Sequence, residues 1–344
     1  MLSARMYEKN DIRIEHVPTP EPGQGELLLK VKAAAICGTD IRMFKNGAKG
    51  ITPQSPCILG HEIAGIIEKT GEGVSAFHVG ERVAIAPNIG CGVCDTCVSG
   101  KGHLCPEYKA LGINMDGGFA EYCLIPRSAV AQGNVCRISD NVSFEEAALN
   151  EPLSCVYNGF ERADIRPGCN VLVVGAGPIG IMHCVLALMA GANVYLNDLS
   201  TDRLNRAHSL YPQIRTISSD LKNEIMQATA GHGADVIITA CPVPAIQSLA
   251  IEIAALEGRI IFFGGIPEDR QPVSLNTNAI HYKQLIVSGT TRASVAQYRK
   301  TLQLISNGCI DIKPLITGRY HLSDIREAID CAARGEGIKS TILF

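Results

Sequence analysis

The sequence lacks any excess of basic charge. Its 31 lysines and arginines stand against 34 acidic residues, the formal net charge is −3, and basic residues form no run anywhere. Nucleic acids and anionic membrane surfaces are bound by patches of positive charge. We therefore expect neither as a partner.

The sequence also lacks a long uninterrupted hydrophobic run. The longest apolar stretch, residues 179–196, contains His183, Gly191 and Asn193 and directly follows a glycine-rich turn. A helix and a strand explain this stretch better than a membrane span. The N-terminal residues are charged from Arg5 onward and have no apolar core of the signal-peptide kind. These features predict no membrane partner and a cytoplasmic location.

Cysteine, by contrast, is abundant, with 14 residues. Without a secretory signal, disulfides are not expected. Most of the cysteines are scattered singly among apolar neighbours, and we interpret these as small buried hydrophobic residues. They are Cys57, Cys123, Cys136, Cys155, Cys169, Cys184, Cys241, Cys309 and Cys331.

The length of the chain and a change in its residue pattern predict two domains. The 46% hydrophobic and 19% charged residues are typical of a soluble globular protein with a sizeable core. Residues 1–150 carry short β-like runs between glycines and prolines, which predict an irregular β-barrel-like domain. These runs are residues 25–32, 63–69, 81–86 and 121–126.

From about Pro167, apolar strand runs alternate with helical stretches. This pattern predicts an α/β fold with a doubly wound parallel sheet. The expected strands are residues 171–174, 193–197, 236–239, 259–263 and 285–288, with helices at 178–189 and from about 201. The alternation stops after about Thr291, where we expect helices at 294–306 and 322–334 and a short strand at 341–344.

A glycine-rich turn follows the first of these strands and opens a helix: Gly175-Ala-Gly177-Pro178-Ile179-Gly180. In this context the glycines allow a tight turn, close approach of a pyrophosphate and packing of helix on strand. Asp198 ends the next strand, where a carboxylate accepts from the adenosine ribose and repels a 2′-phosphate. The turn, Asp198 and Arg203 therefore form a predicted NAD site, whereas the alternative makes Asp198 a solvated turn residue.

A second motif consists of four cysteines in a glycine-rich polar segment: Cys91, Cys94, Cys97 and Cys105. Four thiolates suit a closed tetrahedral zinc site with no vacant position, so its role should be structural. Such a site contributes on the order of 10 kcal/mol to ordering a loop that has little core. A disulfide pair or an iron–sulfur cluster is the competing interpretation.

A third set of residues is dispersed over separate segments: Cys37-Gly-Thr39-Asp40, Gly60-His61-Glu62 and Glu151-Pro152. Each segment is ordinary alone, since a single histidine or cysteine is more often core than ligand. Together they supply sulfur, imidazole and carboxylate ligands. A catalytic zinc needs three such protein ligands and one open position.

With these motifs in order, the chain resembles the zinc-containing medium-chain alcohol dehydrogenases, in the branch of sorbitol (polyol) and L-threonine 3-dehydrogenases. The stretch from Gly60 to Val74 is similar to the family's zinc signature. The resemblance implies a GroES-like catalytic domain of residues 1–153 and 292–344, with a structural zinc lobe at about 88–108. It implies a Rossmann NAD-binding domain at 154–291. It further implies two zinc ions per chain and a homodimer or homotetramer.

The resemblance also assigns the catalytic zinc. Its ligands would be Cys37, His61 and an acidic third residue, either Glu62 or Glu151. Asp40 is expected to orient the imidazole of His61.

Substrate-side roles follow from the same resemblance. Thr39 is expected to take the proton of the alcohol. Relatives often pass it to a histidine three positions later, where this chain has Arg42, which cannot shuttle a proton near neutral pH. The proton exit route is therefore left open. Arg292 is expected near the substrate, with a surface arginine at a helix start as the alternative.

The implied activity is reversible, NAD-linked oxidation of a secondary alcohol of a polyol, cyclitol or sugar derivative to the ketone. Zinc would act as a Lewis acid on the substrate oxygen. The first alternative is oxidation of a 3-hydroxy amino acid, as in L-threonine 3-dehydrogenases, although those carry a substrate-side histidine where this chain has Asn88. Alternatives of other kinds are a zinc-free quinone reductase and a non-catalytic cofactor-binding protein on the same fold.

Overall fold

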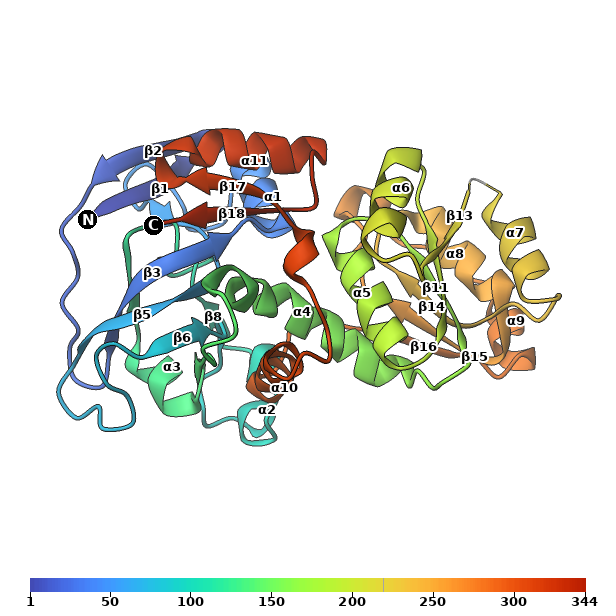
Figure 1. Cartoon of the computed structure of the whole chain (residues 1–344), viewed down its shortest axis with the longest axis horizontal. Coiled ribbons are helices and arrows are strands. Elements are labelled where there is room, and N and C mark those ends of the chain that lie inside the picture. Colours follow the sequence, from blue (N-terminus) through green and yellow to red (C-terminus); the bar gives the residue numbers. More distant parts are fainter. Residues whose placement is uncertain (219) are drawn as a thin grey trace. The chain divides into compact units, whose positions relative to one another are not determined.

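The computed structural model describes residues 1–218 and 220–344, and it divides into two compact units (Figure 1). The first unit combines Met1–Ser154 with Arg292–Phe344, and the second is Cys155–Thr291. The predicted α/β class with a β-rich part and a parallel sheet is confirmed. Among the described residues, no helix combines the length and apolar character needed to cross a bilayer.

The first unit is organised around one large sheet. Its strand order is β10-β6-β5-β3-β18-β17, and β9 also pairs with β3. The bounds are β3 Leu27–Ala35, β5 Glu62–Thr70, β6 Arg82–Ile85, β9 Tyr122–Ile125, β10 Val135–Arg137, β17 Ile316–His321 and β18 Lys339–Leu343. The C-terminal strand thus lies beside a strand from the N-terminal part of the chain.

Smaller elements surround this sheet. A sheet of order β2-β1-β4 and a short β7-β8 pair complete the strands that the structure describes in this unit. Their bounds are β1 Leu2–Glu8, β2 Asp11–His16, β4 Cys57–Ile58, β7 Asn88–Ile89 and β8 Lys109–Ala110. The helical segments are α1 Gly38–Asn46, α2 Asp95–Val98, η1 Gly102–Leu104, α3 Arg127–Gln132, α10 Val295–Ser306, η3 Lys313–Leu315, η4 Leu322–Asp324 and α11 Ile325–Arg334, and α4 Phe144–Ala163 runs across the boundary of the units.

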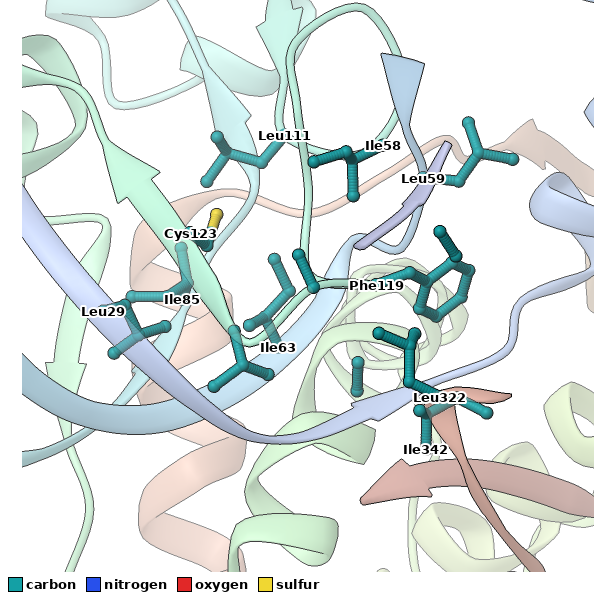
Figure 2. Packing of buried hydrophobic residues seen from close by; sticks show 14 of the residues in the cluster. Leu29, Ile58, Leu59, Ile63, Ile85, Leu111, Phe119, Cys123, Leu322 and Ile342 are labelled. Carbon is teal, nitrogen blue, oxygen red and sulfur yellow. The ribbon is translucent and has the colours of Figure 1, made fainter. Parts of the chain in front are cut away.

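The core of this unit lies between these layers. Figure 2 shows part of it, with Phe119 and Ile63 near Leu322 and Ile342 from the C-terminal segment. Strand β3 is buried on both faces along most of its length, so its near-continuous apolar run is what a central strand requires. Burial of this core pins the register between β3 and β5, which pairs Ala35 with Glu62.

In the second unit, the described residues form a six-stranded parallel sheet. Its strand order is β13-β12-β11-β14-β15-β16. In chain order this is 3-2-1-4-5-6, the Rossmann arrangement. The strands are β11 Asn170–Val174, β12 Asn193–Asn197, β13 Arg215–Ile217, β14 Ala234–Thr239, β15 Ala254–Phe262 and β16 Ile286–Gly289. The helices are α5 Pro178–Met189, α6 Thr201–Leu210, α7 Leu221–Ala228, α8 Pro244–Ile253, η2 Glu268–Arg270 and α9 Thr277–Tyr282. Figure 1 shows α5 and α6 on one side of the sheet and α7, α8 and α9 on the other.

Candidate active site

Helix α1 begins directly after β3 and carries the first predicted zinc ligand at its start. Cys37 is the N-cap residue, and the backbone N–H of Cys37 donates to Asp40 Oδ2 at 2.8 Å. Asp40 is completely buried, so this bond holds its carboxylate in place beneath the turn. The end of β3 and the first turn of α1 therefore fix both side chains.

The second segment enters at the start of β5, which pairs with the end of β3. Gly60 has φ 90°, and a side chain there would overlap the ring of Phe119, so the turn before His61 needs glycine. His61 is 4% exposed, and its Nδ1 lies 3.4 Å from Asp40 Oδ1. Asp40 thus lies beside the Nδ1 side of the imidazole, which leaves Nε2 as the candidate ligand atom, and its orienting role stays a prediction.

The three predicted residues converge. One ligand atom each from Cys37, His61 and Glu62 lies within 4.8 Å of the others, although the residues come from two separate segments. Burial alone would lower the pKa of His61, but the negative charges of Asp40 and Cys37 outweigh it and hold the pKa well above its usual value. A buried cluster that stabilises positive charge in this way is suited to a metal cation.

Lys339, at the start of β18, is a member of this cluster that the sequence analysis missed. Its Nζ lies 2.7 Å and 2.6 Å from the two carboxylate oxygens of Glu62 and donates to the carbonyl of Ile36 at 2.8 Å. Lys339 is only 5% exposed, and although burial lowers its pKa, the charges of Glu62 and Cys37 raise it above the usual value. The signal in the sequence was a single lysine opening an otherwise uncharged C-terminal strand.

Glu151, the other predicted acidic ligand, lies on α4 and is 6% exposed. It is outside the set of atoms that lie within 4.8 Å of one another in the described part of the chain. Thr39 lies in the first turn of α1, and Arg42 Nη2 donates to its hydroxyl at 3.4 Å. The arginine that replaces the expected histidine therefore contacts the residue proposed to take the proton.

The four-cysteine lobe brings its sulfur atoms together. The Sγ atoms of Cys91 and Cys97 are 4.0 Å apart, and those of Cys94 and Cys105 are 3.8 Å apart. Sulfurs that bind one zinc tetrahedrally at about 2.3 Å lie about 3.8 Å from one another, so these residues fit a zinc ion. Backbone N–H groups of Val93 and Cys94 lower the pKa of Cys91 to about 7, which favours the thiolate form.

Arg292 lies against this lobe. Its Nη1 donates to the carbonyl of His103 at 3.0 Å, and its guanidinium carbon lies 3.9 Å from the centre of the Tyr108 ring. The Tyr108 hydroxyl in turn donates to Asn88 Oδ1 at 2.8 Å. The predicted substrate contact of Arg292 stays a prediction.

The predicted dinucleotide residues lie at the carboxyl ends of β11 and β12. Gly175 has φ 113°, a side chain at Gly180 would overlap the Gly175 carbonyl, and nothing lies within 4 Å of the position a side chain would take at Gly177. Pro178 and Ile179 form the first turn of α5, whose N-terminus can face a pyrophosphate.

Asp198 is oriented by its own loop. Its Oδ2 accepts from the backbone N–H of Ala176 at 2.7 Å, and its Oδ1 accepts from that of Ser200 at 2.9 Å. Arg203 Nη1 lies 3.9 Å from Asp198 Oδ2. The bond from Ala176 ties the carboxylate to the glycine-rich turn, at the end of the strand where a dinucleotide-binding carboxylate is expected.

Comparison with known proteins agrees with this geometry. Residues 23–135 match the family described as alcohol dehydrogenase GroES-like domain, and residues 178–307 match that described as zinc-binding dehydrogenase. The chain is 33% identical to a sorbitol dehydrogenase of Bacillus subtilis, over 96% of this chain and 93% of the relative. It is 30% identical to an L-threonine 3-dehydrogenase of Pectobacterium carotovorum, over 98% of this chain and 96% of the relative.

Solved structures point the same way. An Escherichia coli alcohol dehydrogenase complexed with NADH matches with a TM-score of 0.90 and 29% identity, covering 100% of this chain and 99% of the other. The likeness therefore extends over both units. The chain belongs to the zinc-binding alcohol dehydrogenases with a GroES-like domain.

Proposed function

We propose that the protein uses zinc and NAD to oxidise a secondary alcohol of a polyol, cyclitol or sugar derivative to the ketone. The observation that carries this proposal is the convergence of Cys37 and His61, whose ligand atoms lie within 4.8 Å of each other and of the buried Glu62. The names of the relatives, among them sorbitol dehydrogenase, support the polyol class. The reaction is reversible, because hydride transfer can run from either side.

The protein's own groups have defined tasks in this reaction. Cys37 and His61 hold the metal, and the Asp40 carboxylate keeps the imidazole oriented. A zinc ion at this position supplies Lewis acidity that makes the substrate hydroxyl more acidic. NAD supplies the hydride acceptor, while the protein orients the reactants and excludes water.

Glu151 is the acidic third ligand that we favour. Both carboxylate oxygens of Glu62 already accept from Lys339, at 2.7 Å and 2.6 Å, and this ion pair competes with the metal for Glu62. Glu151 is the carboxylate that the resemblance offers as the alternate, and it is buried on α4. Glu62 and Lys339 then line the site as an ion pair with no net charge.

Thr39 receives the proton of the alcohol in this proposal. Arg42 donates to the Thr39 hydroxyl oxygen and stays protonated at any working pH, so it holds this hydroxyl without accepting its proton. The proton must therefore leave Thr39 by a group other than Arg42. Zinc chemistry and proton exit are thus divided between separate residues.

Asp198 makes NAD the favoured cofactor. Its carboxylate stands at the end of β12, and bonds from the backbone N–H groups of Ala176 and Ser200 fix it there. At that place a carboxylate pairs with the ribose hydroxyls and repels the 2′-phosphate of NADP. Arg203 lies beside the same carboxylate and completes this side of the proposed site.

Oxidation of a 3-hydroxy amino acid is the second candidate. It is favoured by the 30% identity to an L-threonine 3-dehydrogenase. Against it stands Asn88, whose side chain is engaged by the Tyr108 hydroxyl and cannot act as an ionisable histidine would. A substrate panel that includes L-threonine separates the two.

We also propose a cytoplasmic location and assembly as a homodimer or homotetramer. The 14 cysteines, all of them among the described residues, form no disulfide, which suits a reducing compartment. Leu256, Tyr282 and Ile286 are 75%, 77% and 46% exposed near β16, the last strand of its sheet among the described residues, and exposed apolar groups at a sheet edge are typical of an interface. A monomer in sedimentation equilibrium would contradict the assembly.

The test is an NAD-reduction screen with zinc-loaded protein over polyols, sugar phosphates, inositols and L-threonine. Each substrate is also offered with NADP, and wild type is compared with Asp198→Ala and with the exposed control Asp202→Ala. We expect NADH formation with a polyol-type substrate. Asp198→Ala should raise KM for NAD by at least about tenfold, the loss expected of a hydrogen bond to a charged group, and relieve the exclusion of NADP.

Two outcomes would count against the proposal. Absence of turnover with every alcohol at two zinc ions per chain would favour a cofactor-binding protein without catalysis. Zinc confined to the cysteine lobe would favour a zinc-free reductase. Equal kinetics of Asp198→Ala and wild type with both cofactors would contradict only the role of Asp198 in cofactor choice and would leave the rest of the proposal standing.

A further inference from the structure

Arg42 is an exposed residue of α1 that lies one helical turn after Thr39. Its Nη2 donates to the Thr39 hydroxyl at 3.4 Å. In the part of the chain that the structure describes, the guanidinium has no other hydrogen-bond partner and forms no ion pair with a carboxylate. An unbalanced positive charge therefore stands beside the residue proposed to receive the proton of the alcohol.

The acidic groups around this point are engaged elsewhere. Asp40 is the acidic residue of α1, but it is completely buried. One of its oxygens accepts from a backbone N–H, and the other lies beside the imidazole of His61. Glu62 accepts from Lys339 with both of its oxygens. The catalytic cluster thus balances its own lysine and leaves the charge of Arg42 unmatched.

The distance from Arg42 to the reacting hydroxyl can be bounded. An alcohol that gives its proton to Thr39 lies about 2.7 Å from the Thr39 hydroxyl oxygen. Arg42 Nη2 is 3.4 Å from the same oxygen, so this nitrogen is within about 6 Å of the alcohol oxygen. A charged group a few bonds from the hydroxyl that is oxidised can therefore reach the guanidinium.

The chemistry of the guanidinium suits an oxyanion. It stays protonated and presents several N–H donors in a planar fork, and the bond to Thr39 uses one of them. The remaining donors can bind two oxygens of a phosphate or carboxylate side by side. A neutral polyol offers only hydroxyl groups, which leave the charge uncompensated.

We propose that Arg42 selects an anionic substrate by binding a phosphate or carboxylate group that lies a few bonds from the hydroxyl that is oxidised. The alcohol is then an acidic polyol or sugar derivative, which Thr39 and Arg42 contact at two points. This inference rests on the proposed function, because it needs the alcohol at Thr39. Two fixed contacts also orient the reacting hydroxyl, which favours its reaction.

The test offers alcohols in matched neutral and acidic pairs to the zinc-loaded protein with NAD. The pairs are sorbitol with sorbitol 6-phosphate, myo-inositol with myo-inositol 1-phosphate, and sorbitol with gluconate. The measured quantity is the ratio of kcat/KM for the acidic alcohol to kcat/KM for its neutral partner. We expect wild type to prefer an acidic alcohol at least about tenfold, the size expected of a hydrogen bond between charged groups. Whether a phosphate or gluconate is preferred identifies the oxyanion.

Two variants of Arg42 test its part in this preference. Arg42→Gln should lower the ratio at least about tenfold, because it removes the charge. Arg42→Lys should give an intermediate ratio, since an ammonium keeps the charge without the planar fork.

Lys45→Gln is the matched control. Lys45 is exposed in the last turn of the same helix, and its replacement changes the net charge as Arg42→Gln does. This variant should keep the ratio of wild type, because an exposed charge that does not contact the substrate is screened by salt.

The inference is overturned if wild type prefers no acidic alcohol to its neutral partner, or if Arg42→Gln keeps the ratio of wild type. It is also overturned if Arg42→Gln raises KM for NAD and slows neutral and acidic alcohols equally, which would assign the guanidinium to the cofactor. Turnover of neutral alcohols in these cases leaves the proposed function standing. Absence of turnover with every alcohol at two zinc ions per chain would overturn the proposed function, and the inference with it.

Discussion

A lysine and a glutamate buried together cost free energy unless each satisfies the other. Lys339 is 5% exposed and Glu62 is fully buried, and their charged groups lie 2.6 Å apart. Removing two charges from water is expensive, and the pair offsets this expense through its own attraction and the bond to the Ile36 carbonyl. Loss of one partner would leave the other charged without compensation.

Replacement of Lys339 by Met should therefore destabilise the first unit by about 3–5 kcal/mol, the usual effect of breaking a buried ion pair. Urea unfolding of the zinc-loaded protein measures the change in free energy. We further expect Glu62→Gln in the Lys339→Met background to recover much of the loss, since it removes the uncompensated charge.

The control for this prediction is Lys69→Met. Lys69 pairs with Glu21 at 2.7 Å, but their side chains are 50% and 72% exposed. Exposed pairs contribute below about 1 kcal/mol. Similar losses of unfolding free energy in Lys339→Met and Lys69→Met would show that burial of the Lys339 pair has no energetic consequence.

His183 is a second buried ionisable residue, in α5 of the other unit. It is 1% exposed, packs edge-on against Phe263 at 4.8 Å between ring centres, and neither ring nitrogen has a partner among the described residues. Burial lowers the pKa of His183 to about 3. The folded protein thus resists protonation of this imidazole, whereas the unfolded chain takes up the proton near pH 6.5.

The sign of the pH effect follows from this difference. Because the folded pKa is depressed, the contribution of His183 to stability is complete above pH 6.5 and declines as the pH falls from about 6.5 towards 3. Between pH 6.5 and 5.5, the free energy of unfolding should therefore fall by about 1 kcal/mol less for His183→Leu than for wild type. Urea midpoints at the two pH values measure this, with the exposed His78→Leu as control; equal pH sensitivity of His183→Leu and wild type would refute it.

At the scale of elements, the cysteine lobe is ordered by its ligands more than by a core. Helix α2 buries none of its residues, and Val93 and Val98 are 83% and 74% exposed. An element with so little buried apolar surface has no hydrophobic driving force of its own. Its order should depend on the metal that the four sulfurs fit.

Cys97→Ser should accordingly open the lobe while leaving the second unit folded. Limited trypsin digestion should cut after the exposed Lys101 at least about tenfold faster than in wild type, because cleavage follows the population of the open form. Cys309→Ser, at an exposed free cysteine, serves as the control. Protection of Lys101 in a zinc-depleted Cys97→Ser sample would show that packing orders the lobe.

Local signals predicted individual elements well. The helix Pro178–Met189 and the strand Asn193–Asn197 have the bounds expected from the glycine-rich turn and the apolar runs around it. The strand at the C-terminus begins at Lys339, two positions before the expected start, because a buried lysine interrupts the apolar pattern. Only its partner 277 residues away makes that lysine compatible with a buried strand.

At the scale of the whole molecule, the sequence predicted ligand types better than ligand geometry. Cys37 and His61 lie together with Glu62, one of the two acidic alternates, whereas their binding of zinc stays a prediction. The choice between Glu62 and Glu151 could not be made from the residues, because it depends on Lys339, a partner of Glu62 that lies 277 positions away along the chain.

The first unit is interrupted by the second, and this has a consequence for synthesis. Residues 155–291 are continuous and can fold as soon as they leave the ribosome, whereas β3 waits for β18, which is translated after the whole second unit. Until then the nascent chain carries Glu62 without its lysine and an open sheet edge at β3. The cluster of Cys37, His61 and Glu62 therefore forms completely only after the second unit has been synthesised.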